Sequence, residues 1–189
     1  MSRYDQILKI IDEVKPSTIT EIGTWNGNRA IVMIKRALQW TPSVTYWGYD
    51  LFEDATDETD KEEFNVKRHN RCDDVHKHIQ DKFGANVKVI LIKGNTKETL
   101  SKKVSDLVWL DGGHSIDTIR HDYEMVKDSK CVLLDDYYSG SIIDTSKFGC
   151  NFIEKEFGGE VLPIKDGVNG GGFVQILRIN NEKSTDNWS

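Results

Sequence analysis

The chain has few of the features that mark secreted or membrane-bound proteins. Its cysteines, Cys72, Cys131 and Cys150, are odd in number and have no paired spacing, so a disulfide framework is not predicted. No apolar run approaches the roughly 18 residues that cross a bilayer. Residues 1–16 carry acids among their apolar positions, unlike a secretion signal. These absences predict a reduced, cytoplasmic protein with no membrane partner.

An excess of positive charge is also lacking. There are 25 Lys and Arg residues against 31 Asp and Glu, which gives a net charge of −6. This balance argues against nucleic acid as a partner. The lysine of a phosphate-binding P-loop is missing, and so is the Gly-x-Gly-x-x-Gly fingerprint of dinucleotide sites. With 189 residues, 38% of them hydrophobic, the chain is long enough for one well-buried core.

Strand-like and helix-like patterns alternate along the chain. Helical spacing marks residues 4–14 and 28–40, and a further helix is expected to begin after Ser115, which can cap it. A Gly-rich turn within 161–179 predicts an antiparallel pair of strands. The other predicted strands cover 18–23, 44–50, 87–94, 106–111 and 131–136. Such alternation predicts an α/β fold with a mostly parallel sheet and helices on both faces.

The domain organisation is expected to be simple. Residues 1–181 are predicted to form one domain, followed by a polar tail over 182–189. Residues 53–84 interrupt the alternation with a run of acids and then a basic stretch. This charged insertion is either a solvated surface helix or a lid. The oligomeric state stays open, and a homo-oligomer is compatible with the sequence.

Polar side chains stand where the predicted strands end. The carboxyl ends of parallel strands meet at one edge of a sheet, where ligands bind in such folds. We therefore expect these side chains to lie in one cleft. They are Glu21, Asp50, Asn95, Asp111, Asp135 and Asp136.

The stretch "EIGTWNGNRA" follows the first predicted strand. Gly23 and Gly27 are spaced Gly-x-x-x-Gly, which permits a sharp turn and a close approach of the backbone to a ligand. Asp50 ends the next strand, where an acid can accept hydrogen bonds from both ribose hydroxyls. Together these residues indicate a nucleoside site without a phosphate clamp. A tight strand-to-helix turn that binds nothing would also need glycine.

Over most of its length the sequence resembles the class I S-adenosylmethionine-dependent methyltransferases. The resemblance rests on Glu21, Gly23, Gly27 and Asp50, and it implies a seven-stranded, Rossmann-like methyltransferase sheet with one antiparallel strand. The stretch "KGNTKETL" lies where that family contacts adenine, but Asn95 stands where the family usually has Asp. The implied cofactor-binding residues are Glu21, Gly23, Thr24, Trp25, Gly27, Asp50, Leu51, Phe52, Asn95, Thr96 and Asp111.

Two further stretches, "LDGGHS" and "LLDDYY", resemble the metal-dependent small-molecule O-methyltransferases, including the macrocin and mycinamicin sugar methyltransferases. The resemblance implies Mg²⁺ on Asp111, Asp135 and Asp136, with His114 as general base; the implied catalytic residues are His114 and Asp111. A hard cation on carboxylates lowers the pKa of a bound hydroxyl, and an imidazole can remove its proton. The implied acceptor is a hydroxyl of a sugar or natural-product-like small molecule. In the structural alternative, Asp111 and Asp135 cap helices or bind backbone amides, and His114 only hydrogen-bonds a carbonyl.

Other functions remain open at this stage. One is a methyltransferase of nucleic acid or protein on the same fold, although the Asn/Asp-Pro-Pro-aromatic signature of amino-directed DNA methyltransferases is missing. Another is a non-catalytic nucleoside-binding module, and a weaker one is a nicotinamide oxidoreductase. His69, Cys72 and His76 have the spacing of one helix face and are weak zinc candidates, for which no fourth ligand is evident.

Overall fold

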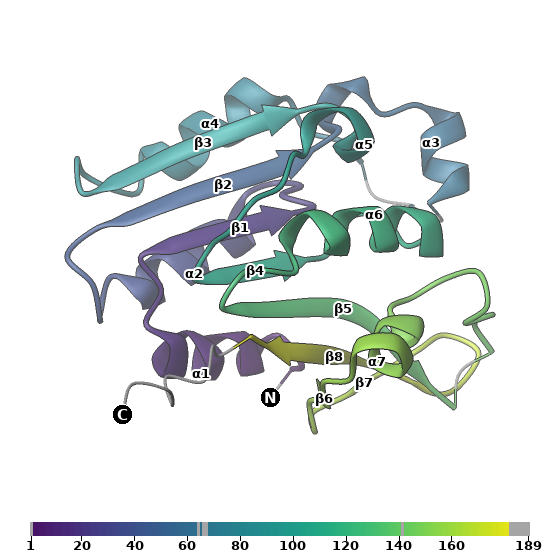
Figure 1. Ribbon diagram of the computed structural model, residues 1–189. Helices are drawn as coiled ribbons and strands as arrows, with labels where there is room; N and C mark the ends of the chain where they lie inside the picture. Colours follow the sequence, from purple (N-terminus) through teal and green to yellow (C-terminus); the bar gives the residue numbers. More distant parts are fainter. Residues whose placement is uncertain (1, 64, 66–67, 141, 182–189) are drawn as a thin grey trace, which may run out of the picture.

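The computed structural model describes residues 2–63, 65, 68–140 and 142–181 (Figure 1). Its centre is a sheet in the order β3-β2-β1-β4-β5-β8-β6, with β7 paired to β8. The first five strands in this order are parallel, and β8 runs antiparallel to β5. The bounds are β1 (Thr18–Ile22), β2 (Val44–Asp50), β3 (Val87–Lys93), β4 (Leu107–Leu110), β5 (Cys131–Ser139), β6 (Glu160–Val161), β7 (Asp166–Gly167) and β8 (Phe173–Asn180).

The mostly parallel sheet with an antiparallel C-terminal pair is confirmed, with one difference. Eight strands are formed among the described residues, where seven were expected. The partner of β8 in the predicted pair is split into two short strands, β6 and β7, which pair with different parts of β8. The chain order reverses beside β1, which lies between β2 and β4. Ligands bind at such a reversal in open α/β sheets.

Helices cover both faces of the sheet (Figure 1). Apolar side chains of α1, α2 and α4 share one hydrophobic core, and those of α6 and α7 share a second core on the opposite face. Central strand β4 is buried at every position, as expected for a strand covered on both faces. The helix bounds are α1 (Asp5–Val14), α2 (Asn28–Ala37), α3 (Asp57–Glu62), α4 (Cys72–Gln80), α5 (Thr96–Thr99), α6 (Ile116–Val126) and α7 (Asn151–Phe157), with a 3₁₀ turn η1 (Phe52–Asp54).

Local sequence signals explain where several helices begin and end. Ser115 caps α6, because its hydroxyl oxygen accepts a hydrogen bond from the Thr118 amide. Helix α1 ends at Lys15, which adopts a left-handed conformation just before Pro16. None of the helices that the structure describes is both long enough and apolar enough to cross a bilayer. The predicted polar tail, 182–189, lies outside the described residues.

Candidate active site

A cavity of about 530 Å³ lies at the carboxyl ends of β1 to β4. Its volume falls within the range of about 300–1,000 Å³ that is usual for small-ligand sites. Most of the predicted cofactor residues and the predicted base meet there, which supports the expectation of one cleft. Those that line it are Glu21, Gly23, Thr24, Trp25, Asp50, Leu51, Asn95, Thr96, Asp111 and His114. Gly27 and Phe52 do not line it, and Asp135 and Asp136 line a neighbouring small cavity.

Glu21 is a buried acid on the cavity wall. Its carboxyl group is 1% exposed and accepts a short hydrogen bond from the Tyr46 hydroxyl. Burial raises the pKa of Glu21 to about 8, although the Tyr46 hydrogen bond and the charge of Arg29 act in the opposite direction. With this pKa, Glu21 is mostly protonated at neutral pH even though the Arg29 charge acts on it.

The two glycines after β1 have different roles. Gly23 has a φ of +93°, and a Cβ atom there would lie 1.9 Å from the Asp111 carbonyl oxygen. Glycine therefore lets the end of β1 approach the end of β4. Gly27 precedes α2 with a φ of +76°, but a Cβ atom there would meet the Ile79 side chain at 2.8 Å. Gly27 thus permits close packing against α4, and the expected contact with cofactor is not supported by its position.

Asp50 organises the loop at the cavity rim. Its two carboxylate oxygens accept hydrogen bonds from the backbone amides of Trp25 and Phe52, each at 2.7 Å. The Trp25 indole N–H donates to the Arg68 carbonyl oxygen at 2.8 Å, which ties the charged insertion to this loop. The Phe52 side chain is 1% exposed and belongs to the hydrophobic core. Phe52 therefore does not offer the cavity a face on which adenosine could pack.

The region after β3 forms another part of the wall. The Asn95 side chain caps α5 by accepting a hydrogen bond from the Lys97 amide at 3.0 Å. Asp122 on α6 also lines the cavity; its carboxyl is hydrogen-bonded to Thr96, while its Oδ1 atom has no partner among the described residues. Burial raises the pKa of Asp122 to about 7. The sequence signal for Asp122 was an acid three residues after Ile119 on an apolar helix stripe.

His114 is held in one orientation. Its Nδ1 atom lies 2.6 Å from the Glu63 carbonyl oxygen. A carbonyl can only accept, so Nδ1 carries the hydrogen, and Nε2 is the proton acceptor of the neutral ring. Nε2 lies 3.3 Å from Asp136 Oδ2. The ring is therefore presented in the tautomer that a general base requires.

Glu63 joins the charged insertion to α6, and sequence reasoning missed it. Its carboxylate accepts hydrogen bonds from the Ser115 amide at 2.8 Å and from the Thr118 hydroxyl at 2.5 Å. Burial raises the pKa of Glu63, but hydrogen bonds from Thr118 and Ser115 outweigh burial and the net shift is downward. The insertion thus forms part of the cavity wall, and Glu63 holds it against the start of α6.

Asp111, Asp135 and Asp136 line the small cavity, whose volume is about 10 Å³, room for about one water molecule. The register of β5 with β8 shifts between Leu134 and Tyr137, and Asp136 has a φ of +62°. Such bulges re-aim side chains near functional sites. Burial and the charge of Asp135 raise the pKa of Asp136, while His114 lowers it. The three acids thus converge where β4 ends and β5 shifts register; Asp135 and Asp136 lie within β5 and not at its end, where the sequence predicts them.

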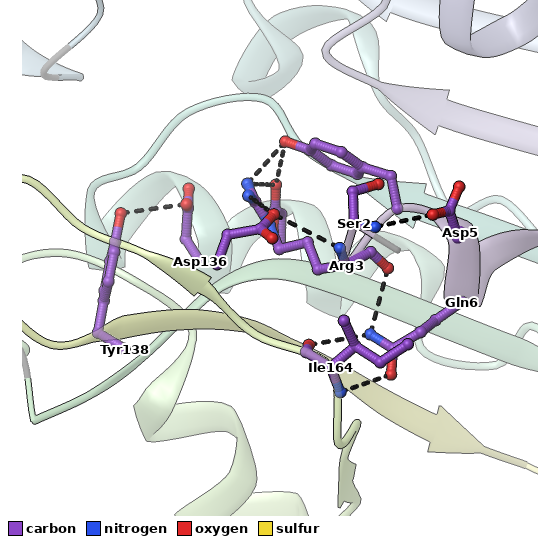
Figure 2. Close-up of polar contacts among 10 residues, drawn as sticks. Ser2, Arg3, Asp5, Gln6, Asp136, Tyr138 and Ile164 are labelled. Carbon is purple, nitrogen blue, oxygen red and sulfur yellow. Dashed lines mark hydrogen bonds and ion pairs between the residues drawn. The ribbon is translucent and has the colours of Figure 1, made fainter.

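The Arg3 guanidinium pairs with the carboxylate of Asp135, one of these three acids (Figure 2). Its Nε and Nη2 atoms donate to the two oxygens of Asp135 at 2.8 Å each, and the Tyr4 hydroxyl donates to Oδ2 at 3.0 Å. Within the part of the chain that is described, no three His, Cys, Asp or Glu side chains form a group that could hold a metal ion. As they lie, Asp111, Asp135 and Asp136 do not fit a divalent cation.

The weak zinc candidates also have separate partners. His69 precedes α4, and its Nε2 atom lies 2.8 Å from Asp60. Cys72 is the first residue of α4, and the Nε2 atom of His76 lies 3.3 Å from the Val89 carbonyl oxygen. His69 is therefore outside the helix whose face it was expected to share.

A family model and three solved structures that resemble this chain are described as methyltransferases. A family model described as a methyltransferase domain matches residues 20–137. A comparison with curated proteins returns no match. The O-methyltransferase NovP is 19% identical, with a TM-score of 0.64 over 94% of this chain and 78% of that one. The O-methyltransferase from Bacillus cereus in complex with SAH is 10% identical, with a TM-score of 0.62 and coverages of 94% and 80%. TomG from Streptomyces achromogenes, an O-methyltransferase involved in tomaymycin synthesis and bound to SAM, is 10% identical, with a TM-score of 0.54 and coverages of 94% and 79%.

Proposed function

The chain belongs to the methyltransferase domain family, and on this premise we propose that it methylates a hydroxyl group of a small molecule. The methyl donor of this class I, Rossmann-like enzyme is S-adenosylmethionine. A sugar or a natural-product-like intermediate is the acceptor that the sequence resemblance favours. The observation that carries the proposal is a single cavity lined by Glu21, Asp50 and Asn95 and also by Asp111 and His114.

The cofactor would occupy the part of the cavity formed by the ends of β1, β2 and β3. Each Asp50 oxygen keeps a free lone pair beside its bond to a backbone amide, so the ribose hydroxyls can donate to this carboxylate. Glu21 would face the positively charged methionine part, and Asn95 with Thr96 would lie near adenine. Two neighbours of the fold, described as bound to SAH and to SAM, support the identity of the cofactor.

The transfer itself is an in-line displacement. The acceptor oxygen forms a bond to the methyl carbon, the carbon–sulfur bond breaks, and its electron pair returns to sulfur, which leaves S-adenosylhomocysteine. His114 Nε2 would take the hydroxyl proton, because Nδ1 is already committed to the Glu63 carbonyl oxygen. Asp136, at 3.3 Å from Nε2, would then stabilise the imidazolium. Asp111, at the end of β4, would contact the acceptor.

Metal assistance stays a prediction from the sequence resemblance. A divalent cation on Asp111, Asp135 and Asp136 would have to displace the Arg3 guanidinium from both oxygens of Asp135. The proposed transfer does not pass through a metal, since the three acids do not fit a divalent cation as they lie.

The test of this function is turnover of S-adenosylmethionine with a panel of hydroxylated sugars and phenols. His114→Gln is expected to lower kcat by about 10²–10⁴-fold, the usual contribution of a general base, while the Kd for the cofactor stays nearly unchanged. The matched control is His76→Gln, the same change on α4, where the ring lies outside the cavity. Turnover that is equal in the two variants would contradict the assignment of His114.

The turnover assay and two binding measurements separate the rival functions. Cofactor that binds but is not turned over with any acceptor would favour the non-catalytic module. Binding of RNA or DNA with a steep dependence on salt would favour a nucleic-acid methyltransferase. Preference for NAD over S-adenosylmethionine in calorimetry would favour an oxidoreductase.

A further inference from the structure

The Arg3 side chain is held from three sides beside the acidic cluster, by which we mean Asp111, Asp135 and Asp136. Beyond its paired bonds to Asp135, Arg3 donates from Nη1 to Asp166 at 2.9 Å and from Nη2 to the Tyr4 hydroxyl at 2.6 Å. Its side chain is only 13% exposed, and that of Asp135 is 2% exposed. A paired guanidinium–carboxylate contact of this kind is among the stronger hydrogen-bonded pairs in proteins.

The backbone around Arg3 is anchored as well (Figure 2). The Gln6 side chain donates to the Ile164 carbonyl oxygen at 3.0 Å and accepts from the Ile164 amide at 2.9 Å. Gln6 also donates to the Arg3 carbonyl oxygen at 3.2 Å. These bonds join the start of α1 to the segment between β6 and β7. Arg3 therefore reaches the acidic cluster from a fixed backbone position.

The charge of Asp135 is compensated by one of this protein's own side chains, Arg3, while the His114 ring lies beside Asp136. A carboxylate group that is buried without a cation is costly, and one whose oxygens already accept from a guanidinium offers few free lone pairs to a metal. A hard divalent cation would have to break the paired contact and leave the buried guanidinium with only Asp166 and Tyr4 as partners.

We propose that the Arg3 guanidinium is the built-in cation of the acidic cluster and that methyl transfer by this chain needs no divalent metal. Metal-independent methyl transfer rests on the proposed function, whereas the pairing of Asp135 with the Arg3 guanidinium does not. Arg3 is a positioning residue here, because it acts through Asp135 and Tyr4.

Tyr4 links Arg3 to the main cavity. The Tyr4 ring lies against two guanidinium groups, with Arg3 at 4.2 Å and Arg29 at 3.9 Å from its centroid. Tyr4 and Arg29 both line the main cavity. Because its hydroxyl accepts from Arg3 and donates to Asp135, Tyr4 is fixed on the cavity wall by the contacts that neutralise the cluster.

The test is Mn²⁺ binding to the full chain, read from the loss of the free-ion EPR signal, which requires no acceptor. Wild type is expected to bind Mn²⁺ weakly. Arg3→Met, which keeps the apolar stem, is expected to bind it at least about tenfold more tightly, since it frees Asp135 for a cation that takes oxygen ligands. Adding Asp135→Asn to Arg3→Met is expected to abolish the gain. Equal affinity in wild type and Arg3→Met, whether tight or weak, would overturn the proposal.

Arg3→Lys provides a second variant in case Arg3→Met does not fold. Lysine keeps the charge but loses the fork that pairs with both oxygens, so Mn²⁺ affinity is expected to rise by a smaller factor, roughly threefold. Affinity unchanged from wild type in a folded Arg3→Lys would also overturn the proposal. Once an acceptor is known, wild-type kcat is expected to survive chelation within about twofold, while Arg3→Met gains stimulation by Mg²⁺. Loss of wild-type turnover on chelation would refute metal independence without touching the proposed reaction.

Discussion

Among single residues, Glu21 shows how burial can couple the protonation of a carboxyl group to the binding of a charged ligand. The carboxyl group lies on the cavity wall, is almost fully buried, and has a pKa of about 8. A cation placed next to a protonated carboxyl favours its ionised form and lowers its pKa. Binding of the positively charged cofactor should therefore be coupled to the loss of a proton from Glu21.

We predict that S-adenosylmethionine binding at pH 7 releases close to one proton per chain. With a pKa of about 8, Glu21 is protonated in most free molecules at pH 7, so affinity should rise as the pH increases from 6 to 8 and ionises it beforehand. Calorimetry in buffers of different ionisation enthalpy measures the proton count. Glu21→Gln should remove both the release and the pH dependence; a release that persists in this variant would assign the proton to another group.

The candidate site could be predicted from the sequence only where function follows local pattern. Glu21, Asp50 and Asp111 were predictable because each ends a recognisable strand and strand ends share one edge of the sheet. Arg3 was not, since an arginine before the first helix has no local mark of function, and the only local mark of Asp122 is an acid on the apolar stripe of a helix. Their roles come from packing against residues distant in sequence.

At the scale of elements, the charged insertion is the part whose position decides the orientation of the His114 ring. The segment after α3 supplies the Glu63 carbonyl that accepts from His114 and the carboxylate that accepts from Ser115. An acidic run reads as a solvated face in sequence, because nothing local reveals that one carboxylate reaches the first turn of α6. Its place at a helix start also suits the helix dipole.

We predict that Glu63→Gln destabilises the fold by about 1–3 kcal/mol, the usual cost of leaving a buried donor without its partner. An amide can still accept from Thr118, but its NH₂ group would face the Ser115 amide, so one hydrogen bond is lost. Urea denaturation measures the change. Glu58→Gln, an exposed acid of α3, is the matched control and should leave stability nearly unchanged. Equal stability of the two variants would show that Glu63 does not hold the segment in place.

At the scale of the whole molecule, the cavity joins elements from both halves of the sheet. Its walls come from the ends of β1, β2 and β4, from α5 and α6, and from the charged insertion. A ligand that binds all of these at once should stabilise the native chain as a unit. Ligand binding to the native state alone adds about 2.7 kcal/mol at one hundred times its Kd.

We predict that S-adenosylhomocysteine at this excess raises Tm by about 5–10 °C, since 1 kcal/mol shifts Tm by about 2–4 °C in a chain of this size. Differential scanning calorimetry measures the shift. NAD at the same concentration should leave Tm unchanged, and Asp50→Asn should reduce the shift because the ribose hydroxyls lose a charged acceptor. A larger shift with NAD would refute the identity of the cofactor.

The overall architecture followed from the alternation of strand and helix patterns, which is a local property repeated along the chain. The division of the last pair into β6, β7 and β8 did not follow. β6 and β7 are each two residues long, too short to show a period. They are defined only by pairing with β8, and that pairing depends on the rest of the sheet.

The anchoring of Arg3 has a practical consequence for any peptide joined ahead of Ser2. The Ser2 amide donates to Asp5 at 2.7 Å, so a purification handle fused there would start one residue from the guanidinium that neutralises Asp135. If the handle pulls Arg3 away, the proposal for the acidic cluster predicts that the fused chain binds divalent ions more tightly than the chain without the handle. Whether preparations agree on an ion requirement would then depend on how each was cloned.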